Sequence, residues 1–202
     1  MFIEQLPVWV RFVKGTKWRY SHKKNDIYLT FDDGPIPEVT PWVLDLLDHY
    51  GIKATFFCVG ENVSKYPELY QEILRRGHQT GNHSYNHIKG LHRHSDDYIA
   101  NVEKAARLID SHLYRPPHGL VSYAQYKKLR EQGYLIVLWD VVPRDYNRKL
   151  RPEQVLHKAC HYTRKGSIIV FHDSLKAEKN VRYALPRYIE YCLSKNYNFK
   201  LV

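Results

Sequence analysis

Tyr28-Leu-Thr-Phe-Asp-Asp-Gly-Pro35 is the stretch that decides how the chain folds. The apolar, β-rich residues up to Phe31 predict a strand, and Gly34-Pro35 predicts the turn that ends it. Adjacent side chains of a strand point to opposite faces, so Asp32 and Asp33 can serve one site only where the strand becomes a loop. Two adjacent carboxylates repel each other unless a cation or a proton lies between them. An isolated Asp-Asp-Gly is usually a solvated turn, so the case for a site depends on residues downstream.

The size and composition of the chain fit one domain. It has 202 residues, of which 44% are hydrophobic and 14% aromatic, enough for a sizeable core. No segment approaches the roughly 20 apolar residues of a membrane span. Glu4, Pro7 and Arg11 interrupt the apolar patches at the start, where a secretion signal would need an unbroken run. We therefore expect residues 1–25 to form an N-terminal arm packed on a domain of residues 26–202.

The chain is basic, with 31 Lys and Arg against 21 Asp and Glu and a net charge of +10. Such a field favours polyanions, among them nucleic acid and an anionic cell envelope. The basic residues are scattered, however, and there is no basic helix, RNA-binding aromatic signature or zinc-finger spacing. We therefore expect a basic surface and no nucleic-acid partner.

Expected strands and helices alternate along the chain. Strands are expected at residues 27–31, 53–59, 78–82, 113–115, 134–139, 167–171 and 197–202. Helices are expected from Thr40 as N-cap to Gly51, at 67–76, from Ser95, from the Ser122 capping box to Gly133, at 152–162, and at 181–195 with a kink at Pro186. About seven strands with long crossovers predict an α/β fold, an irregular parallel (β/α) barrel. A doubly wound open sheet is the second choice.

Polar residues follow the expected strands at their carboxyl ends, where a parallel barrel carries its chemistry. They are Asp32, Asp33, His83, His87, Arg115, Asp140, Asp145 and His172. On one helical turn, the four-residue spacing of His83 and His87 would place both imidazoles on one face. That spacing alone is a weak signal among twelve histidines. With a carboxylate from another strand end, however, it gives a two-histidine, one-carboxylate set with open positions, as in catalytic metal sites.

Five motifs occur in order along the chain. They are Thr30-Phe-Asp-Asp-Gly-Pro35, His83-Ser-x-x-His87, Arg115-Pro-Pro-His-Gly119, Asp140-x-x-x-x-Asp145 and Ile168-x-Val170-x-His172. Together they resemble the motifs of the polysaccharide deacetylase family, the NodB-homology domain of the carbohydrate esterases, over roughly residues 26 to 202. The resemblance implies a metal-dependent hydrolase that removes N-acetyl groups from a glycan such as peptidoglycan, a chitin-type oligosaccharide or another envelope polysaccharide.

The resemblance also implies a metal site and a base. Asp33, His83 and His87 would bind one divalent metal ion, for which this nitrogen and oxygen ligation suits Zn²⁺ best and Co²⁺ or Ni²⁺ as alternatives. Asp32 would be the general base that takes the proton of the attacking water. Arg115 would pair with Asp32 and hold it ionised.

The remaining motif residues would complete the reaction. His172 would be the general acid that protonates the leaving amine, and Asp145 would orient it or sustain its charge. A backbone N–H near His118 would stabilise the oxyanion. Pro117, His118 and Tyr146 would line the substrate pocket.

Three departures from the family pattern bear on the substrate. His118 stands where the family usually has Tyr or Phe, Val142 where Asp is common, and Tyr146 where Trp is expected. His118 and Tyr146 motivate a second hypothesis, the same hydrolysis of a non-sugar amide, an imide or an O-acetyl ester. A third hypothesis, a carbohydrate-binding relic without activity, would require a lost catalytic residue, and every one is present. We expect the cytoplasm by default and the cell envelope as the alternative that the substrate class suggests. The sequence does not determine the oligomeric state.

Overall fold

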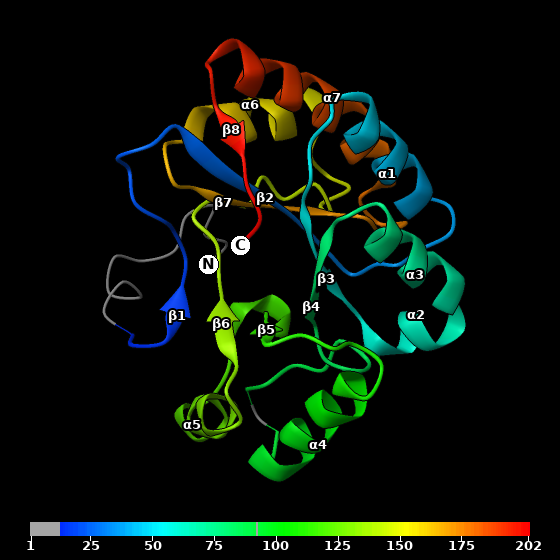
Figure 1. The fold of residues 1–202 in the computed structure, drawn as a ribbon, viewed down its shortest axis with the longest axis vertical. Coiled ribbons are helices and arrows are strands. Elements are labelled where there is room, and N and C mark those ends of the chain that lie inside the picture. The colour runs from blue at the N-terminus through cyan, green and yellow to red at the C-terminus, as the bar shows by residue number, and fades with distance from the viewer. Residues whose placement is uncertain (1–12, 92) are drawn as a thin grey trace.

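The computed structural model describes residues 13–91 and 93–202, so residues 1–12 of the expected arm lie outside it (Figure 1). The strands are β1 Thr16–Lys17, β2 Asp26–Asp32, β3 Thr55–Cys58, β4 Gln79–Asn82, β5 Leu113–Tyr114, β6 Leu135–Val137, β7 Ile168–His172 and β8 Asn198–Phe199. The helices are α1 Thr40–His49, α2 Gly60–Lys65, α3 Pro67–Arg75, α4 Ser95–Ala106, α5 Tyr123–Glu131, α6 Pro152–Tyr162 and α7 Glu178–Ser194, with a 3-10 segment, η2, at Pro117–Gly119.

The strands form one curved parallel sheet with the helices around its outside (Figure 1). Seven strands lie in the order β1-β6-β5-β4-β3-β2-β7, and each neighbouring pair is parallel. The short β8 pairs with the start of β2. A parallel bridge between Val141 and Ile169 links the segment after β6 to β7. These pairings confirm the irregular parallel (β/α) barrel and not the doubly wound sheet.

The last part of the expected arm lies against the sheet. β1 pairs with β6 through Thr16 opposite Ile136 and Lys17 opposite Val137. The ring of Tyr20 stacks on that of Tyr28, with 3.9 Å between centroids. β1 therefore extends the sheet beyond β6.

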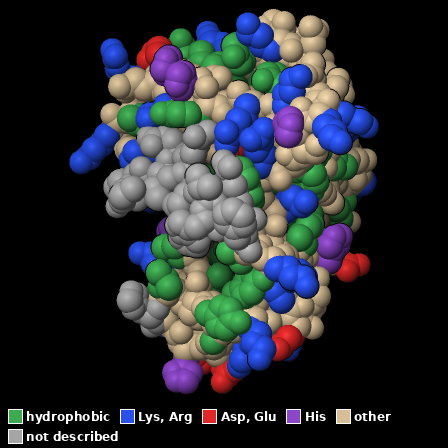
Figure 2. Space-filling model, turned by 90° about the vertical axis from the view of Figure 1, so that its left-hand side faces the viewer, with side chains coloured by type: hydrophobic (Ala, Val, Ile, Leu, Met, Phe, Trp, Pro, Cys, Tyr) green, Lys and Arg blue, Asp and Glu red, His purple; other side chains and the backbone are tan. Residues whose placement is uncertain are grey.

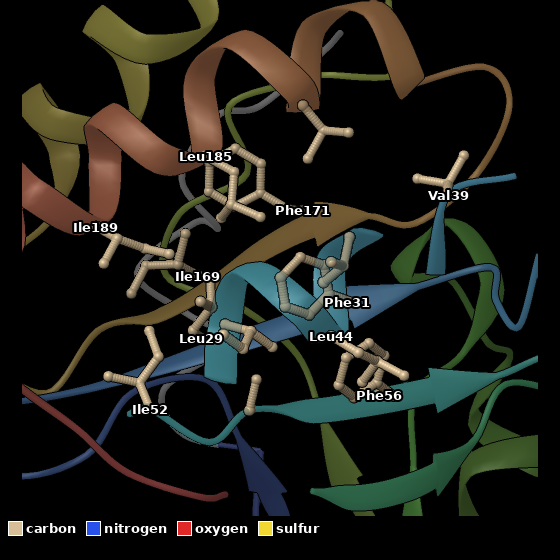
Figure 3. Packing of buried hydrophobic residues seen from close by; sticks show 14 of the residues in the cluster. Leu29, Phe31, Val39, Leu44, Ile52, Phe56, Ile169, Phe171, Leu185 and Ile189 are labelled. Atoms are coloured by element: carbon tan, nitrogen blue, oxygen red, sulfur yellow. The ribbon is translucent and has the colours of Figure 1, made fainter. Parts of the chain in front are cut away.

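The side chains of β2 alternate between the main core and the interior of the barrel. Leu29 and Phe31 lie in the apolar cluster beneath α1 and α7, where the ring of Phe31 stacks on Phe56 at 5.0 Å (Figure 3). Thr30 and Asp32 both contact the Arg115 guanidinium instead. Burying one large apolar side chain contributes roughly 1.5–3 kcal/mol. A slip of one residue would exchange the two faces, so apolar burial fixes where Asp32 points.

The surface agrees with the scattered basic residues of the sequence. Lys and Arg side chains are spread over much of the face shown in Figure 2 and do not gather in one patch there. Within residues 13–91 and 93–202, the helices are all too short or too polar to span a lipid bilayer.

Helix boundaries differ from the sequence predictions in three places. Val39, and not Thr40, is the N-cap of α1, because the Thr40 hydroxyl is engaged with Asp173 at 2.6 Å. α2 was not predicted, since its first residue is Gly60 and no side chain caps it. α7 begins at Glu178 and runs through Pro186 without a break. Burial of the α7 side chains in the main core offsets the cost of a proline inside a helix.

Candidate active site

Three ligand-type side chains meet at the carboxyl ends of β2 and β4. Among the described residues, Asp33, His83 and His87 form a group whose ligand atoms all lie within 4.8 Å of one another. The Asp33 Oδ1 atom is 3.8 Å from His83 Nε2 and 3.4 Å from His87 Nε2. Asp33 has left the strand, with a φ of 84°, as expected for two carboxylates that serve one site. The sequence prediction of this grouping is therefore matched by the geometry.

The two histidines converge by a route that the sequence did not predict. The segment after β4 is a loop and not a helical turn, with positive φ values of 63° at Ser84 and 55° at His87. The Asn82 side chain accepts a hydrogen bond from the Ser84 N–H at 2.8 Å, and the Ser84 hydroxyl accepts one from the Ile88 N–H at 3.2 Å. This turn places the imidazole centroids of His83 and His87 5.1 Å apart.

These three residues fit a bound transition metal ion. Asp33 Oδ1 is buried and has no hydrogen-bond partner among the described residues. His83 Nδ1 lies 2.7 Å from the Arg115 carbonyl, which can only accept, so Nδ1 carries the hydrogen and Nε2 keeps its lone pair. Burial and the neighbouring His87 lower the pKa of His83 to about 3, which keeps the imidazole neutral. One carboxylate oxygen and two imidazole nitrogens are an apt donor set for Zn²⁺.

Arg115 and Asp32 form a buried ion pair beside this group. Arg115 Nη1 donates to Asp32 Oδ1 at 2.6 Å and to the Thr30 hydroxyl at 2.8 Å. Its other nitrogens donate to two carbonyls near the end of β6, and the Phe57 ring lies 4.0 Å from the guanidinium carbon. Burial lowers the pKa of the guanidinium, and the Asp32 carboxylate opposes that shift. The pair therefore holds Asp32 in a fixed direction.

His172, at the end of β7, lies opposite Asp32 in the sheet register. The Asp145 carboxylate accepts from His172 Nδ1 at 2.8 Å and from the His172 backbone N–H at 2.7 Å. Burial alone would lower the pKa of His172, but Asp145 and the two aspartates that end β2 raise it to about 10. The Tyr146 ring meets the imidazole edge-on at 4.9 Å. His172 is therefore an imidazolium at neutral pH, with the proton on Nε2 free to leave.

A groove continues from the metal-binding group along the 3-10 segment. Its volume is about 340 Å³, and it is lined by Lys89, Gly90, Leu91, Pro117, His118 and Leu120. The exposed His118, with a φ of 61°, places its ring 4.8 Å from that of His87. Gly119 closes the turn at a φ of 71°, and a Cβ there would lie 2.4 Å from the Trp139 ring. Pro117 and His118 thus border this groove, and their contact with substrate stays a prediction.

Asp140, by contrast, lies apart from the other polar residues of the expected strand ends. Its carboxylate accepts two bonds from Arg164, at 2.6 and 2.8 Å, and one from the Ser167 hydroxyl at 2.7 Å. These contacts join the end of β6 to the start of β7. Asp140 is thus a structural carboxylate, and Asp145 is the one that reaches His172.

Asp173 holds the loop that carries the first motif. Its carboxylate accepts from the Gly34 N–H at 3.1 Å and from the Thr40 hydroxyl at 2.6 Å. A Cβ on Gly34 would lie 2.0 Å from Asp173 Oδ2, so only glycine fits there. Burial raises the pKa of Asp173 to about 8.

Two asparagines that belong to none of the five motifs also position the site. The Asn62 amide donates to the Asp33 carbonyl at 2.8 Å. The Asn180 amide donates to the Asp145 carbonyl at 2.7 Å. Both act on main-chain atoms from helices that are distant in sequence, and only the folded chain reveals such contacts.

Comparison with known proteins agrees with the motifs. The family model described as polysaccharide deacetylase matches residues 19–137. A peptidoglycan-N-acetylglucosamine deacetylase of Bacillus cereus is 33% identical over 195 residues, which cover 92% of this chain and 90% of that protein. A chitooligosaccharide deacetylase of Azorhizobium caulinodans is 31% identical over 169 residues, 80% of each chain.

Solved structures share the fold. The peptidoglycan N-acetylglucosamine deacetylase Bc1960, in complex with 4-naphthalen-1-yl-N-oxidanyl-benzamide, superposes with a TM-score of 0.90. It is 30% identical, and the match covers 98% of this chain and 95% of that one. BA3943 of Bacillus anthracis, described as a CE4 family pseudoenzyme, has a TM-score of 0.81 at 21% identity, with coverage of 93% and 67%, and shares the fold alone.

Proposed function

Because this chain belongs to the polysaccharide deacetylase family, we propose that it is a metal-dependent hydrolase that removes N-acetyl groups from a glycan. The observation that carries the proposal is the convergence of Asp33, His83 and His87 beside a buried base and an imidazolium on adjacent strands. Relatives named as peptidoglycan and chitooligosaccharide deacetylases support a peptidoglycan or chitin-type substrate.

Asp33, His83 and His87 would hold the cation, with Zn²⁺ the best match to their donor atoms and Co²⁺ or Ni²⁺ as alternatives. When bound there, a divalent cation supplies Lewis acidity, which acidifies water and polarises the acetyl carbonyl. The hydrogen bond from His83 Nδ1 to the Arg115 carbonyl fixes the tautomer that ligation needs.

Asp32 acts as the general base. The Arg115 guanidinium donates to one of its oxygens at 2.6 Å and holds the carboxylate in a fixed direction. As the bond between the water oxygen and the acetyl carbon forms, the water proton passes to Asp32.

His172 acts as the general acid. Asp145 holds Nδ1 and sustains the positive charge, so the Nε2 proton is available. When the bond between the acetyl carbon and nitrogen breaks, this proton passes to the leaving nitrogen, and the products are acetate and a free amine. Without it an amide nitrogen is a poor leaving group, so the raised pKa of His172 serves the second half of the reaction.

The groove beside His118 is lined mainly by apolar groups, among them Leu91, Pro117 and Leu120, which suits the face of a sugar ring adjacent to the one that reacts. The alternative is the same hydrolysis of a non-sugar amide, an imide or an O-acetyl ester. It is favoured by His118 and Tyr146, which stand beside the metal-binding group and the general acid where the family has other aromatic residues.

Acetate release tests the proposal. N-acetylglucosamine oligomers and peptidoglycan fragments are assayed with metal-depleted protein and again after addition of Zn²⁺, Co²⁺ or Ni²⁺. We expect metal-dependent release that is lost in Asp32→Asn and in His172→Ala. Undiminished release in either variant would overturn the assigned roles. A parallel panel of esters and imides separates the alternative, and turnover of none of these substrates with any metal would indicate a binding protein.

A further inference from the structure

A second pair of histidines, outside the active site, lies one turn apart on α6. The rings of His157 and His161 are nearly parallel, with centroids 5.6 Å apart and an angle of 10° between their planes. Both residues are exposed. Glu153, also exposed, stands one turn before His157, so the three side chains form one row along the helix.

The helix that carries this row is firmly packed. Val155 and Ala159, on the opposite face of α6, are completely buried in the main core. The Thr163 hydroxyl lies 2.8 Å from the Ala159 carbonyl and 2.8 Å from the Tyr188 hydroxyl on α7, which ties the end of α6 down. The packed backbone therefore sets the separation of His157 and His161, and little ordering is needed for both to contact one ion.

The surface around the pair is hollowed. A depression of about 370 Å³ is lined by Glu153, Gln154, His157, Lys158, His161 and Tyr162. The Tyr162 ring meets His161 edge-on at 4.8 Å and limits its movement on one side. The row thus borders a space that an ion and its remaining water ligands can enter.

We propose that His157 and His161 bind a second divalent transition-metal ion, Zn²⁺, Ni²⁺ or Cu²⁺, with water molecules as its remaining ligands. Neutral imidazole is a preferred ligand of these three ions. Once one imidazole has bound, the fixed helix presents the second at a high effective concentration. The site shares no residue with the Asp33, His83 and His87 group and lies on a different element.

Metal stoichiometry tests this inference on the full chain. The metal-depleted protein is dialysed against Zn²⁺, and bound zinc is measured by elemental analysis. We expect two ions per chain for the wild type and one for His157→Ala/His161→Ala, with acetate release unchanged. The single change His157→Ala weakens the second ion on the order of 10²-fold. Alanine favours the helix, so folding is preserved.

The matched control removes two other exposed histidines. His49 ends α1 and His112 precedes β5, so His49→Ala/His112→Ala should keep two ions. A second measurement uses the Asp33→Ala/His83→Ala variant, in which the first site is removed. The electron paramagnetic resonance spectrum of its bound Cu²⁺ should show nitrogen hyperfine splitting from two imidazoles. Adding His157→Ala should reduce the number of coupled nitrogens. Wild-type stoichiometry and affinity in His157→Ala/His161→Ala would overturn the inference, as would an equal loss in the control. If Asp33→Ala/His83→Ala still binds two ions, the proposed active site fails while the α6 site stands.

Discussion

Asp145→Asn tests how the general acid keeps its proton. His172 has a pKa of about 10, against an ordinary value of 6.5, and Asp145 is the first of the neighbours that raise it. At pH 8 an imidazole of pKa about 10 is about 99% protonated, whereas one of pKa 6.5 is only about 3% protonated. The reaction needs the protonated form, so activity is lost as the pH rises through the pKa. We expect kcat/KM at pH 8 to fall by about 30-fold or more, since burial lowers the pKa further once the charge is gone.

The assay is the pH profile of kcat/KM for acetate release by wild type and variant. The alkaline limb should move from near pH 10 to pH 6.5 or below, so that the two enzymes differ less at pH 6 than at pH 8. The matched control is Asp140→Asn, which neutralises another buried carboxylate after the same strand, one that contacts Arg164 and Ser167. An unmoved limb in Asp145→Asn, or an equal movement in the control, would refute the reasoning.

Three further changes probe the rest of the site. Arg115→Met leaves the Asp32 carboxylate buried without its partner. Urea denaturation should show a free energy of unfolding lower by roughly 3–5 kcal/mol. A loss below about 1 kcal/mol would contradict the buried pair. Gly34→Ala forces a Cβ onto the Asp173 carboxylate and should lower the free energy of unfolding by about 1–3 kcal/mol. Most acetate release should be lost as well. Wild-type stability and wild-type activity together would count against the tight contact. A chelator should abolish acetate release by the wild-type protein, and added Zn²⁺ should restore it. Added Zn²⁺ should not restore acetate release by His83→Ala. Acetate release that survives verified metal removal would exclude the proposed cofactor.

The barrel could be predicted because its strands are marked by apolar runs and its helices by caps and stops. The Ser122 capping box is present as predicted, with the Gln125 N–H donating to the Ser122 hydroxyl at 3.2 Å. Local chemistry sets these boundaries, so the sequence is sufficient. α2 has no capping side chain, and its presence depends on contacts such as those from the Gly60 and Glu61 amides to carbonyls of the loop after β4.

The residues of the candidate site could be predicted from the sequence, but the backbone conformation that brings them together could not. His83 and His87 could be paired from their spacing, yet the two positive φ values of their loop follow from bonds made by Asn82 and Ser84. The motif resemblance assigned Asp145 to His172, but the structural role of Asp140 could not be predicted, because its partner Arg164 comes from a distant part of the chain. Long-range partners of this kind decide which of two equivalent side chains reaches the reaction.

Residue 115 serves the site through two different kinds of atom. Its carbonyl receives the Nδ1 hydrogen of His83, and its guanidinium holds Asp32. Every amino acid has a carbonyl, so exchanging the side chain cuts one connection and spares the other. A substitution of this side chain therefore removes the contact with Asp32, the proposed base, and leaves in place the hydrogen bond that sets the His83 tautomer.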